Sequence, residues 1–574
     1  MDKKAAANVL EEIGVLLEMK GESVFRCLAY TKAARALRAY PGELDEIIAS
    51  TDLKGIRGIG EGIRERIIEL STTGRLAYYE ELKKSLPPGI IQLLKVPGLG
   101  PKKAKALLET LGITSIAELE YACNENRLIS LPGFGDRTQK KILENIAFLK
   151  KHSERYLYSF AASEAQRLYA PLVKSGKVGR IAVAGSIRRK KEIIKDIDIL
   201  ASSDDPASVM DVFTGLPDVE IIVGKGETKS SVTLASGIAA DLRVVTDEQF
   251  PYALQYFTGN QDHNVRLRGI AKKMGLKLNE YGLFRTDDDT LVKCADEECI
   301  YRVLGLDYVE PELREDMGEV EAALEGGLPN LINEKDILGL FHMHSRYSDG
   351  KDEIIEIAEA AKKHGYKYIG ITDHSQVVAY AGGMKISDLF KQHEDIDDVN
   401  GRVEGFHVFK GSEVDIMPDG TLDYPDEILA SLDYTVCSIH SKFKMTEDEA
   451  TKRILRAMEN PHFTILGHPT GRLLLGREGY PLDMKKVIDA AASLGVAIEL
   501  NAHPQRLDID WREMRHAREK GVKIAISPDA HNLGGFDDVA YGIGIARKGW
   551  LEKKDVLNCM TLEEVEKFFK RRRG

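Results

Sequence analysis

Three aspartates are the first side chains in this sequence whose spacing could support chemistry. Asp196 and Asp198 lie two residues apart in a segment of alternating apolar residues, and Asp241 lies in a similar segment further along the chain. Side chains two residues apart on a strand point to the same face, so this pair can bind hard cations together. Three such carboxylates can hold two Mg²⁺ ions roughly 4 Å apart, one activating a hydroxyl and the other binding a triphosphate.

A glycine–serine turn precedes the acidic pair. Gly185 and Ser186 follow the apolar run 181–183 and lead into a basic stretch that includes Arg189. The turn can offer N–H and hydroxyl donors to triphosphate oxygens, and the arginine can neutralise developing charge as a bidentate donor. An isolated Asp-x-Asp is most often a solvated strand edge, but the turn and the third aspartate together favour a nucleotidyl-transfer site.

Histidines form a second group, concentrated in the last two-fifths of the chain. Of the 14 histidines, only His152 and His263 precede residue 342. Six of the others end or follow short apolar runs: His342, His344, His374, His440, His468 and His531, with Glu413 and Asp529 in equivalent places. Imidazole and carboxylate together favour Zn²⁺, Mn²⁺ or iron over Mg²⁺ alone. The histidines at 364, 393, 407, 462, 503 and 516 are interpreted as structural or surface residues.

The elements that must position these histidines read as strands alternating with helices. Seven β-rich runs are expected, at residues 338–344, 366–374, 406–416, 434–441, 463–468, 496–501 and 522–527. Helical stretches between them make βα units, which favour a parallel barrel one strand short of the regular eight. In such a barrel the C-terminal strand ends meet at one mouth, so the ligand-type residues are expected to gather there.

The first 150 residues read as helices separated by three similar turns. Each turn has a hydrophobic-Gly-hydrophobic-Gly core before a helix start, with its glycines at 58 and 60, 98 and 100, or 133 and 135. Glycine allows backbone conformations closed to other residues, and the helix N-terminus turns free N–H groups outward to hold a phosphate. A single Gly-x-Gly is usually a plain helix–helix turn. Three copies indicate repeated use as a sequence-independent nucleic-acid contact.

Composition limits the classes of protein that remain. At 574 residues the chain is several times the ~150 residues of an average domain, so several cores are expected. With 43% hydrophobic and 30% charged residues it reads as globular, and the sequence offers no apolar run of about 18 residues for a membrane span. Six cysteines, none in a C-x-x-C pair, fit a reducing cytoplasm. The net charge of −11 argues against a general polyanion binder.

The first half resembles a known enzyme family. The three turns resemble helix-hairpin-helix motifs in the order of the N-terminal and fingers domains of family X DNA polymerases. The Gly-Ser turn with the three aspartates resembles that family's nucleotidyltransferase signature, and residues 256–264 resemble its Tyr-Phe-x-Gly segment. The resemblance runs to about Asp316. It implies a polymerase that fills gaps in DNA during base excision repair, with the aspartates as catalytic metal ligands.

The same resemblance implies roles for further residues. In the family, the tyrosine and phenylalanine crowd the sugar against a 2′-hydroxyl, and the asparagine reaches the minor-groove edge of the incoming base. Nucleotide binding is thereby expected at Gly185, Ser186, Arg189, Tyr256, Phe257, Gly259, Asp262 and Asn264. DNA binding is expected at Arg26, Tyr30, Gly58, Gly60, Arg66, Gly98, Gly100, Gly133, Gly135 and Arg268.

One departure concerns the deoxyribose-phosphate lyase activity of some relatives. Arg66 stands where those members carry their Schiff-base lysine, and Gly62 stands at a second lysine site. A guanidinium stays protonated and cannot form an imine, so lyase activity by that route is not expected. Arg26, Tyr30 and Arg66 can still bind a 5′-phosphate, since that needs only charge and donors.

The second half resembles the polymerase and histidinol phosphatase (PHP) domain. The resemblance implies a metal-ligand set of His342, His344, Asp349, His374, Glu413, His440, His468, Asp529 and His531, holding two to three Mn²⁺ or Zn²⁺ ions. It also implies 3′-to-5′ exonuclease or phosphoesterase activity. Leu340 replaces an Asp that often precedes the first His-x-His, and Pro528 replaces the usual hydroxyl residue, so a supporting carboxylate is expected to be lost.

The sequence therefore predicts a multidomain α+β and α/β enzyme. The expected parts are an N-terminal helix-hairpin-helix domain (1–86), fingers (87–150), a nucleotidyltransferase palm (151–250), a thumb (251–318), a linker (319–336) and a distorted (β/α)7 PHP barrel (337–574). The expected partners are gapped or primed DNA and dNTPs, with two Mg²⁺ in the palm; we expect a cytoplasmic monomer. Two alternatives stay open, a polymerase whose PHP domain is a non-catalytic metal-stabilised scaffold, and a phosphatase tethered to DNA.

Overall fold

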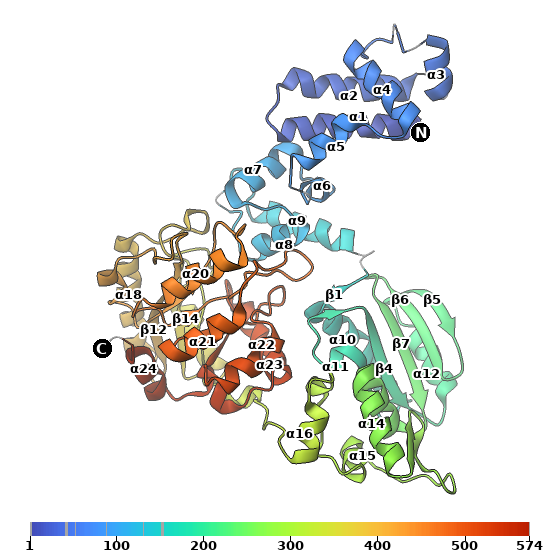
Figure 1. Ribbon diagram of the computed structural model, residues 1–574, viewed down its shortest axis with the longest axis vertical. Helices are drawn as coiled ribbons and strands as arrows, with labels where there is room; N and C mark the ends of the chain where they lie inside the picture. Colours follow the sequence, from blue (N-terminus) through green and yellow to red (C-terminus); the bar gives the residue numbers. More distant parts are fainter. Residues whose placement is uncertain are drawn as a thin grey trace. The chain divides into compact units, whose positions relative to one another are not determined.

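The computed structural model describes residues 3–40, 44–51, 53–54, 56–87, 89–129, 131–150 and 154–572. It divides into two compact units. The first comprises Met1–Cys123 and Leu128–Leu149, and the second comprises Asn124–Arg127 and Lys150–Gly574. Figure 1 shows both units and labels many of their helices and strands as they are named below. None of the helices in these described ranges is both long enough and apolar enough to cross a membrane.

The first unit is helical, as the spacing of its apolar residues predicts. In its first helix, Ala6, Leu10, Ile13 and Leu17 recur at three- and four-residue intervals and are all buried. Two apolar cores hold the unit, one around α1–α5 and one around α6–α9. Its helices are α1 (Lys3–Met19), α2 (Val24–Ala39), α3 (Leu44–Thr51), α4 (Glu61–Thr73), α5 (Ala77–Lys84), α6 (Ile90–Leu93), α7 (Pro101–Leu111), α8 (Ile116–Asn124) and α9 (Asp136–Lys150).

The second unit begins with a palm built on a five-stranded sheet in the order β2-β4-β7-β6-β5. Strands β4 and β7 pair in parallel, and the other neighbours are antiparallel. Helices α10 and α12 contact the sheet around one buried core. The elements are β1 (Tyr156–Leu157), α10 (Tyr158–Lys174), β2 (Ile181–Val183), α11 (Gly185–Arg188), β3 (Ile193–Ile194), β4 (Asp196–Ser202), α12 (Pro206–Thr214), β5 (Val219–Lys225), β6 (Lys229–Leu234) and β7 (Ala239–Val245).

The thumb follows with its own apolar core, centred on Tyr252, Leu267 and Tyr301. Residues 319–336, expected as a linker, include a helix whose Val320 and Ala323 join this core, so the segment is packed into the thumb. The elements are α13 (Phe250–Thr258), α14 (Gln261–Lys273), β8 (Leu276–Asn279), β9 (Gly282–Arg285), α15 (Glu297–Val303), η1 (Pro311–Leu313), α16 (Glu319–Glu325) and η2 (Glu334–Asp336).

The last part is a nearly closed barrel of seven parallel strands in chain order, β10 to β16. Each strand lies within one of the seven runs expected from the sequence. The strands are almost entirely buried because helices cover the outer face, as in α/β proteins generally. The segments that follow the first and last strands meet through a bridge between Met343 and Ala530, where the His344 N–H donates to the Ala530 carbonyl at 2.9 Å.

The barrel strands are β10 (Gly339–Leu340), β11 (Tyr368–Ile371), β12 (His407–Asp415), β13 (Tyr434–Ser438), β14 (Ile465–Leu466), β15 (Ala497–Asn501) and β16 (Ile524–Ser527). The helices are α17 (Ile354–Lys363), α18 (Ile386–Arg402), α19 (Asp426–Leu429), α20 (Glu447–Met458), α21 (Met484–Leu494), α22 (Trp511–Glu519), α23 (Val539–Lys548) and α24 (Leu562–Lys570). Short 3-10 turns are η3 (Ala379–Ala381), η4 (Leu533–Asp538), η5 (Lys553–Asp555) and η6 (Leu557–Cys559).

Candidate active site and metal centre

The palm sheet brings the three predicted aspartates together. In the parallel register of β4 and β7, Asp198 lies directly beside Asp241. Asp196 precedes Asp198 by two positions and therefore shares its face of the sheet. Lys229 of β6 contacts the Asp241 carboxylate at 2.7 Å. Two neighbouring strands thus place three carboxylates on one surface.

The electrostatics of this group fit a cation site. Burial and the neighbouring carboxylates of Asp196 and Asp241 raise the pKa of Asp198 to about 6. Carboxylates held this close repel one another when ionised, and a divalent cation between them removes that repulsion. Oxygen-only donors of this kind suit Mg²⁺.

Gly185 lies against the metal-ligand group. Its φ is +62°, a left-handed conformation that favours glycine, and a Cβ at this position would overlap the Asp198 carboxylate. The Asp198 carbonyl accepts a hydrogen bond from the Ala184 N–H at 2.8 Å. The turn that begins α11 with Gly185 and Ser186 is therefore fastened directly to the strand that carries two of the aspartates.

Two other predicted nucleotide ligands are bonded within the protein. The Arg189 guanidinium donates to Glu315 at 3.0 Å and to the Thr258 carbonyl at 2.8 Å. The Asn264 amide donates to the Tyr256 carbonyl at 2.7 Å and accepts from Gln255 at 3.0 Å. Their roles toward a nucleotide stay predictions, and these bonds show what each side chain must keep or exchange when a ligand arrives.

The aromatic pair expected beside the sugar is preformed. Tyr256 and Phe257 end α13 with their rings edge to face, 5.1 Å between centroids. Arg243 of β7, two residues after Asp241, lies over the Phe257 ring at 4.6 Å. The half-buried pair is thus tied to the same strand as the third aspartate. Asp262 and Arg268 are exposed on α14.

The barrel gathers all nine residues of the predicted PHP ligand set. All are buried. Four groups place ligand atoms within 4.8 Å of one another: His344 with Asp349, His374 and His531; His342 with His344 and Asp529; His374 with Glu413 and His440; and Glu125 with Asp529 and His531. His468 joins through Glu413, at 2.9 Å.

Glu413 is the centre of this cluster. Its carboxylate lies 2.8 Å from His374, 3.1 Å from His440 and 2.9 Å from His468. Burial alone would raise the pKa of Glu413, but these and the other surrounding histidines hold it well below its usual range. A carboxylate shared by several imidazoles is suited to bridge two metal ions.

Buried ring nitrogens that form no hydrogen bond support the same interpretation. Among the described residues, His342 Nε2, His374 Nδ1 and His374 Nε2, and both ring nitrogens of His440 are buried without a hydrogen-bond partner. Buried polar atoms normally form hydrogen bonds, so several ring nitrogens that lie near carboxylates without forming such bonds fit metal coordination. Three ligands also adopt positive φ, namely His342 (+61°), His468 (+22°) and Asp529 (+53°). Such strain clusters at functional sites. The donor set fits Mn²⁺, Zn²⁺ or iron.

A carboxylate that the sequence analysis missed supports the first histidine. Glu499 of β15 lies 2.6 Å from His342 Nδ1, and its second oxygen accepts the His468 N–H at 2.6 Å. This places a carboxylate behind a candidate ligand, so the supporting group expected to be lost with Leu340 comes from another strand. Only the alternation of β15 hinted at it, since Glu499 interrupts an apolar run.

Two more acids lie at the cluster without having been expected there. Asp373 accepts from the Ser345 N–H at 2.8 Å and from Gln392 at 2.6 Å, and so holds the loop that carries Asp349. Glu125, in the short segment grouped with the second unit, lies 2.5 Å from His531 and 3.5 Å from His503. His503, which the sequence analysis assigned to a structural or surface role, therefore borders the metal centre.

The three glycine turns of the first unit share one geometry. Gly58, Gly98 and Gly133 have φ of +103°, +82° and +87°. In each turn the residue after this glycine donates its N–H to the carbonyl three residues earlier, at 3.0–3.1 Å. A Cβ on Gly60, Gly98, Gly100, Gly133 or Gly135 would meet nothing within 4 Å. These turns therefore present open backbone, which suits close approach by a phosphate.

The predicted 5′-phosphate ligands also lie together in the first unit. Arg66 stacks over the ring of Tyr78 at 3.8 Å and lies 5.6 Å from that of Tyr30. Arg26 donates to the Tyr78 hydroxyl at 3.1 Å. The Tyr30 hydroxyl is buried, and the described residues provide it with no hydrogen-bond partner. Two guanidiniums and an unsatisfied hydroxyl fit an anion.

The whole chain is similar to a curated protein. It is 40% identical over 573 residues to the "DNA polymerase/3'-5' exonuclease PolX" of Bacillus subtilis (strain 168), with 100% of both chains covered. The chain belongs to the family X DNA polymerases with a C-terminal PHP domain. Matches to family descriptions agree: a helix-hairpin-helix domain at residues 1–76, a SAM-like helix-hairpin-helix tandem at 90–147, the DNA polymerase beta thumb at 253–315 and the PHP domain at 341–503.

The PHP part of this family X polymerase also has separate relatives. It is 32% identical over 204 residues to a probable phosphatase of Caldanaerobacter subterraneus subsp. tengcongensis, covering 32% of this chain and 73% of the relative. A probable phosphatase of Thermoanaerobacter sp. (strain X514) is 33% identical over 204 residues, with 32% and 76% covered. The family and fold expected from the sequence are confirmed.

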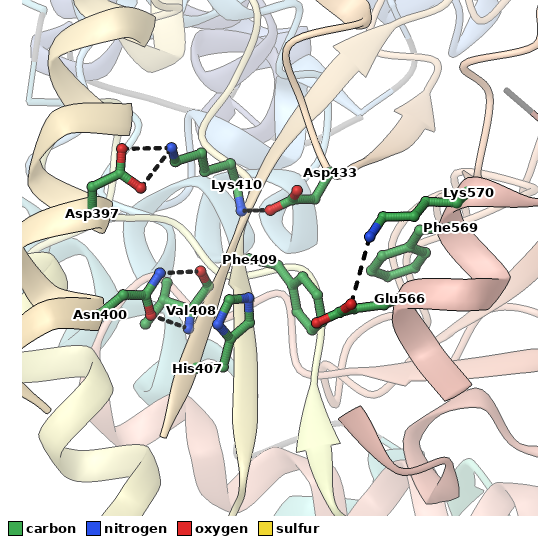
Figure 2. Close-up of a pocket in the computed structure, with 10 residues that line it drawn as sticks. All are labelled: Asp397, Asn400, His407, Val408, Phe409, Lys410, Asp433, Glu566, Phe569 and Lys570. Atoms are coloured by element: carbon green, nitrogen blue, oxygen red, sulfur yellow. Dashed lines mark hydrogen bonds and ion pairs between the residues drawn. The ribbon is translucent and has the colours of Figure 1, made fainter. Parts of the chain in front are cut away.

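A hollow of about 270 Å³ lies at the end of the polymerase's PHP barrel away from the metal cluster, and Figure 2 shows the residues that line it. Its lining comes from strand starts such as His407 of β12, whereas the metal cluster is at strand ends. Its charges pair with one another: Lys410 contacts Asp397 at 2.6 Å, and Lys570 contacts Glu566 at 3.5 Å. This hollow is therefore separate from the candidate metal centre, and we assign it no activity.

Proposed function

We propose that the chain fills short gaps in DNA by template-directed nucleotidyl transfer in its palm, and that its PHP barrel separately removes 3′ nucleotides by metal-dependent hydrolysis. The observation that carries the first part is the β4–β7 register, which sets Asp198 beside Asp241 with Gly185 against them. The proposed substrates are gapped or primed duplex DNA and dNTPs. The proposed setting is the cytoplasm, with the chain acting as a monomer in base excision repair.

In the proposed polymerase reaction, Asp196, Asp198 and Asp241 hold two Mg²⁺ ions. When bound, these ions supply charge to the primer hydroxyl and to the triphosphate. Ser186 and the N–H groups of its turn bind triphosphate oxygens, and Arg189 faces the charge that develops there. The pKa of about 6 for Asp198 leaves this carboxylate ionised at neutral pH.

Selection of the nucleotide is assigned to α13 and the turn that follows it. The Tyr256–Phe257 pair forms a wall beside the sugar and excludes a 2′-hydroxyl by contact. Asn264, now bonded to the backbone of that turn, exchanges one of these bonds for the minor-groove edge of the incoming base. A Cβ on Gly259 would come within 2.7 Å of Asn264 Oδ1. The close packing of Asn264 against this turn therefore requires glycine at position 259.

DNA itself is held largely by backbone contacts. The three glycine turns bind phosphates of the duplex, and Arg26, Tyr30 and Arg66 bind the 5′-phosphate at the far side of a gap. Arg66 is stacked on Tyr78 and carries no amine for an imine, so we propose no lyase step at this position.

In the barrel, we propose that the nine predicted ligands hold two to three Mn²⁺ or Zn²⁺ ions. When bound, the ions supply an activated water for phosphoester hydrolysis. Glu413 would hold the ions at the centre of the cluster, Glu499 fixes the ring of His342 through Nδ1, and Asp373 holds the loop of Asp349. A barrel that is only a metal-stabilised scaffold is the alternative, and it differs by having no hydrolysis at all.

Two single substitutions on a gapped primer separate these activities. Asp198→Ala is expected to lower Mg²⁺-dependent extension by about 10³-fold or more and to leave Mn²⁺-dependent 3′ degradation intact, while His344→Ala does the reverse. Matched controls are Asp204→Ala in the palm and His364→Ala on the barrel, both exposed. Loss of both activities in either folded variant contradicts two independent sites, and a wild-type chain without degradation supports the scaffold.

A further inference from the structure

A lysine of the PHP barrel lies buried beside the polymerase turn. Lys548 ends α23, and its side chain is fully buried. Its ammonium donates to Glu315 at 2.7 Å, to the Arg189 carbonyl at 3.0 Å and to the Glu312 carbonyl at 3.3 Å. A lysine has three N–H donors, so all are used. One acceptor, the Arg189 carbonyl, belongs to the segment that follows Ser186, and the other two belong to Glu312 and Glu315.

Glu315 lies between cationic side chains of the barrel helix α23 and of the palm segment that follows Ser186; this meeting of α23 with the palm segment is called the junction below. One carboxylate oxygen accepts from Lys548 and from Arg189, and the other lies 3.8 Å from Lys191 and 3.4 Å from Asn260. Burial alone would raise the pKa of Glu315, but Lys548 and Arg189 hold it below its ordinary value. The carboxylate is therefore ionised and joins the barrel lysine to the turn arginine.

The junction is closely fitted as well as charged. A Cβ on Gly544 of α23 would approach the Lys190 side chain to 3.2 Å. Lys190 Nζ in turn donates to the Tyr158 hydroxyl at 2.7 Å, and the Tyr158 ring meets that of Tyr541 edge to face. The residues that follow Ser186 are thus held between the palm helix α10 and the barrel helix α23.

Burying the Lys548 ammonium costs desolvation free energy, so we interpret its burial by the way it positions its partners. Desolvation lowers the pKa of Lys548 to about 8 despite the attraction of Glu315. A buried ion pair contributes little net stability compared with apolar packing, but it fixes the direction of its partners. Lys548 contacts the carbonyl of Arg189 directly and reaches its guanidinium through Glu315, and Arg189 is the residue proposed to face the triphosphate.

We propose that Lys548 of the PHP barrel is a positioning residue for the polymerase reaction, fixing Arg189 through Glu315 so that the nucleotide-binding turn is ordered before a dNTP arrives. This inference rests on the proposed function of the turn. It makes incorporation by the palm dependent on an intact barrel surface far along the chain, and independent of the metal ligands of the barrel.

The test uses the full-length chain with Lys548→Met, which keeps the length of the side chain and removes the charge. Single-nucleotide incorporation on a gapped duplex with Mg²⁺ is measured over a range of dNTP concentrations. Because a charge-assisted hydrogen bond is lost, KM for the dNTP is expected to rise about tenfold. The concentration of gapped DNA that gives half-maximal rate, and the rate of Mn²⁺-dependent 3′ degradation, are expected to stay unchanged.

Arg547→Met is the matched control. Arg547 precedes Lys548 on the same helix and pairs with Glu312 at 2.7 Å, so its loss loosens the same junction without touching Glu315 or Arg189. The control is expected to keep the wild-type KM for the dNTP. An equal rise in both variants would overturn the proposal in favour of general loosening, and so would an unchanged KM in Lys548→Met.

Glu315→Gln provides a second test of the proposal, and this variant can be measured by itself if Lys548→Met folds poorly. If Lys548 acts through Glu315, the double variant raises KM no more than the larger single effect, whereas independent residues multiply their effects. Multiplied effects, or a Glu315→Gln chain with wild-type KM, would refute the proposal. Failure of the proposed function looks different, because the wild-type chain itself would then incorporate no nucleotide.

Discussion

The palm and the PHP barrel solve the problem of holding cations in opposite ways. The palm offers three carboxylates on two neighbouring strands, with Asp196 exposed and Asp198 half-buried. The barrel surrounds its site with six imidazoles and three carboxylates, all buried. An open oxygen site suits Mg²⁺ ions that arrive with a triphosphate and leave with the product. A closed nitrogen-rich site suits ions that stay through many turnovers.

Removal of metal ions by a chelator is expected to give the largest difference between the activities of the palm and of the barrel. After treatment with a chelator and its removal, Mg²⁺ alone is expected to restore gap filling completely. Degradation from the 3′ end stays lost until Mn²⁺ or Zn²⁺ is added, because imidazole ligands bind those ions in preference. Both activities are followed on one labelled gapped duplex. Equal recovery of degradation with Mg²⁺ alone would remove the contrast in metal choice.

Glu413→Gln tests the closed site at its centre. The variant loses the charge that several histidines surround, so degradation is expected to fall by about 10³-fold while gap filling is kept. Glu404→Gln, an exposed substitution on the same barrel, serves as the control and should match wild type. A variant that degrades DNA normally would show that hydrolysis does not depend on the Glu413 carboxylate.

Gly185→Ala tests the open site. The added Cβ would overlap Asp198 and also strain a φ of +62°, so the aspartate and the turn must move apart. A displacement of this size is expected to lower incorporation about 10²-fold and to leave degradation unchanged. Gly224→Ala, in open space on the palm strand β5, is the control. Normal incorporation by Gly185→Ala would mean that the turn does not need its contact with Asp198.

The smallest effect is expected at Glu297, a buried carboxylate that is paired with arginines and not with histidines. Burial would raise the pKa of Glu297, but Arg314 and Arg188 lower it to about 2, so this carboxylate stabilises the fold above its ordinary pKa of 4.5 and loses that contribution as pH falls toward 2. Glu297→Gln is expected to cost about 2 kcal/mol at neutral pH. The difference in thermal midpoint from wild type should shrink below pH 4.5.

The exposed neighbour Glu298→Gln is the control for this measurement. A difference between wild type and Glu297→Gln that is constant from neutral to acid pH would assign the effect to shape, not charge. It would also weaken the contrast between Glu297, which two arginines neutralise, and Glu413, which lies among histidines.

The sequence predicted those parts of both regions that depend on local spacing. Strand alternation placed Asp196 and Asp198 on one face, and the ends of apolar runs identified the histidines of the barrel. The register that sets Asp198 beside Asp241 joins strands separated by two others in the chain, and only the fold could supply it. The family resemblance supplied Asp349, which lies in a loop outside any strand.

Residues whose roles depend on distant partners could not be predicted. Lys548 at a helix end reads as an ordinary surface lysine, because nothing nearby in the sequence indicates its burial. Arg189 was expected to face a triphosphate, yet its partner Glu315 lies 126 residues away. Glu499 supports His342 across 157 residues. Burial and pairing over such separations follow from tertiary packing, which local sequence patterns do not indicate.

The place where the two ends of the barrel sheet meet lies at the candidate metal centre. The segments that follow the first and last strands approach each other through a bridge between Met343 and Ala530. His342 and His344 flank one side of this bridge, and Asp529 and His531 flank the other. A cation held by His342, His344 and Asp529 would join residues from the two sides of this bridge, so metal loading would be coupled to closure of the barrel wall.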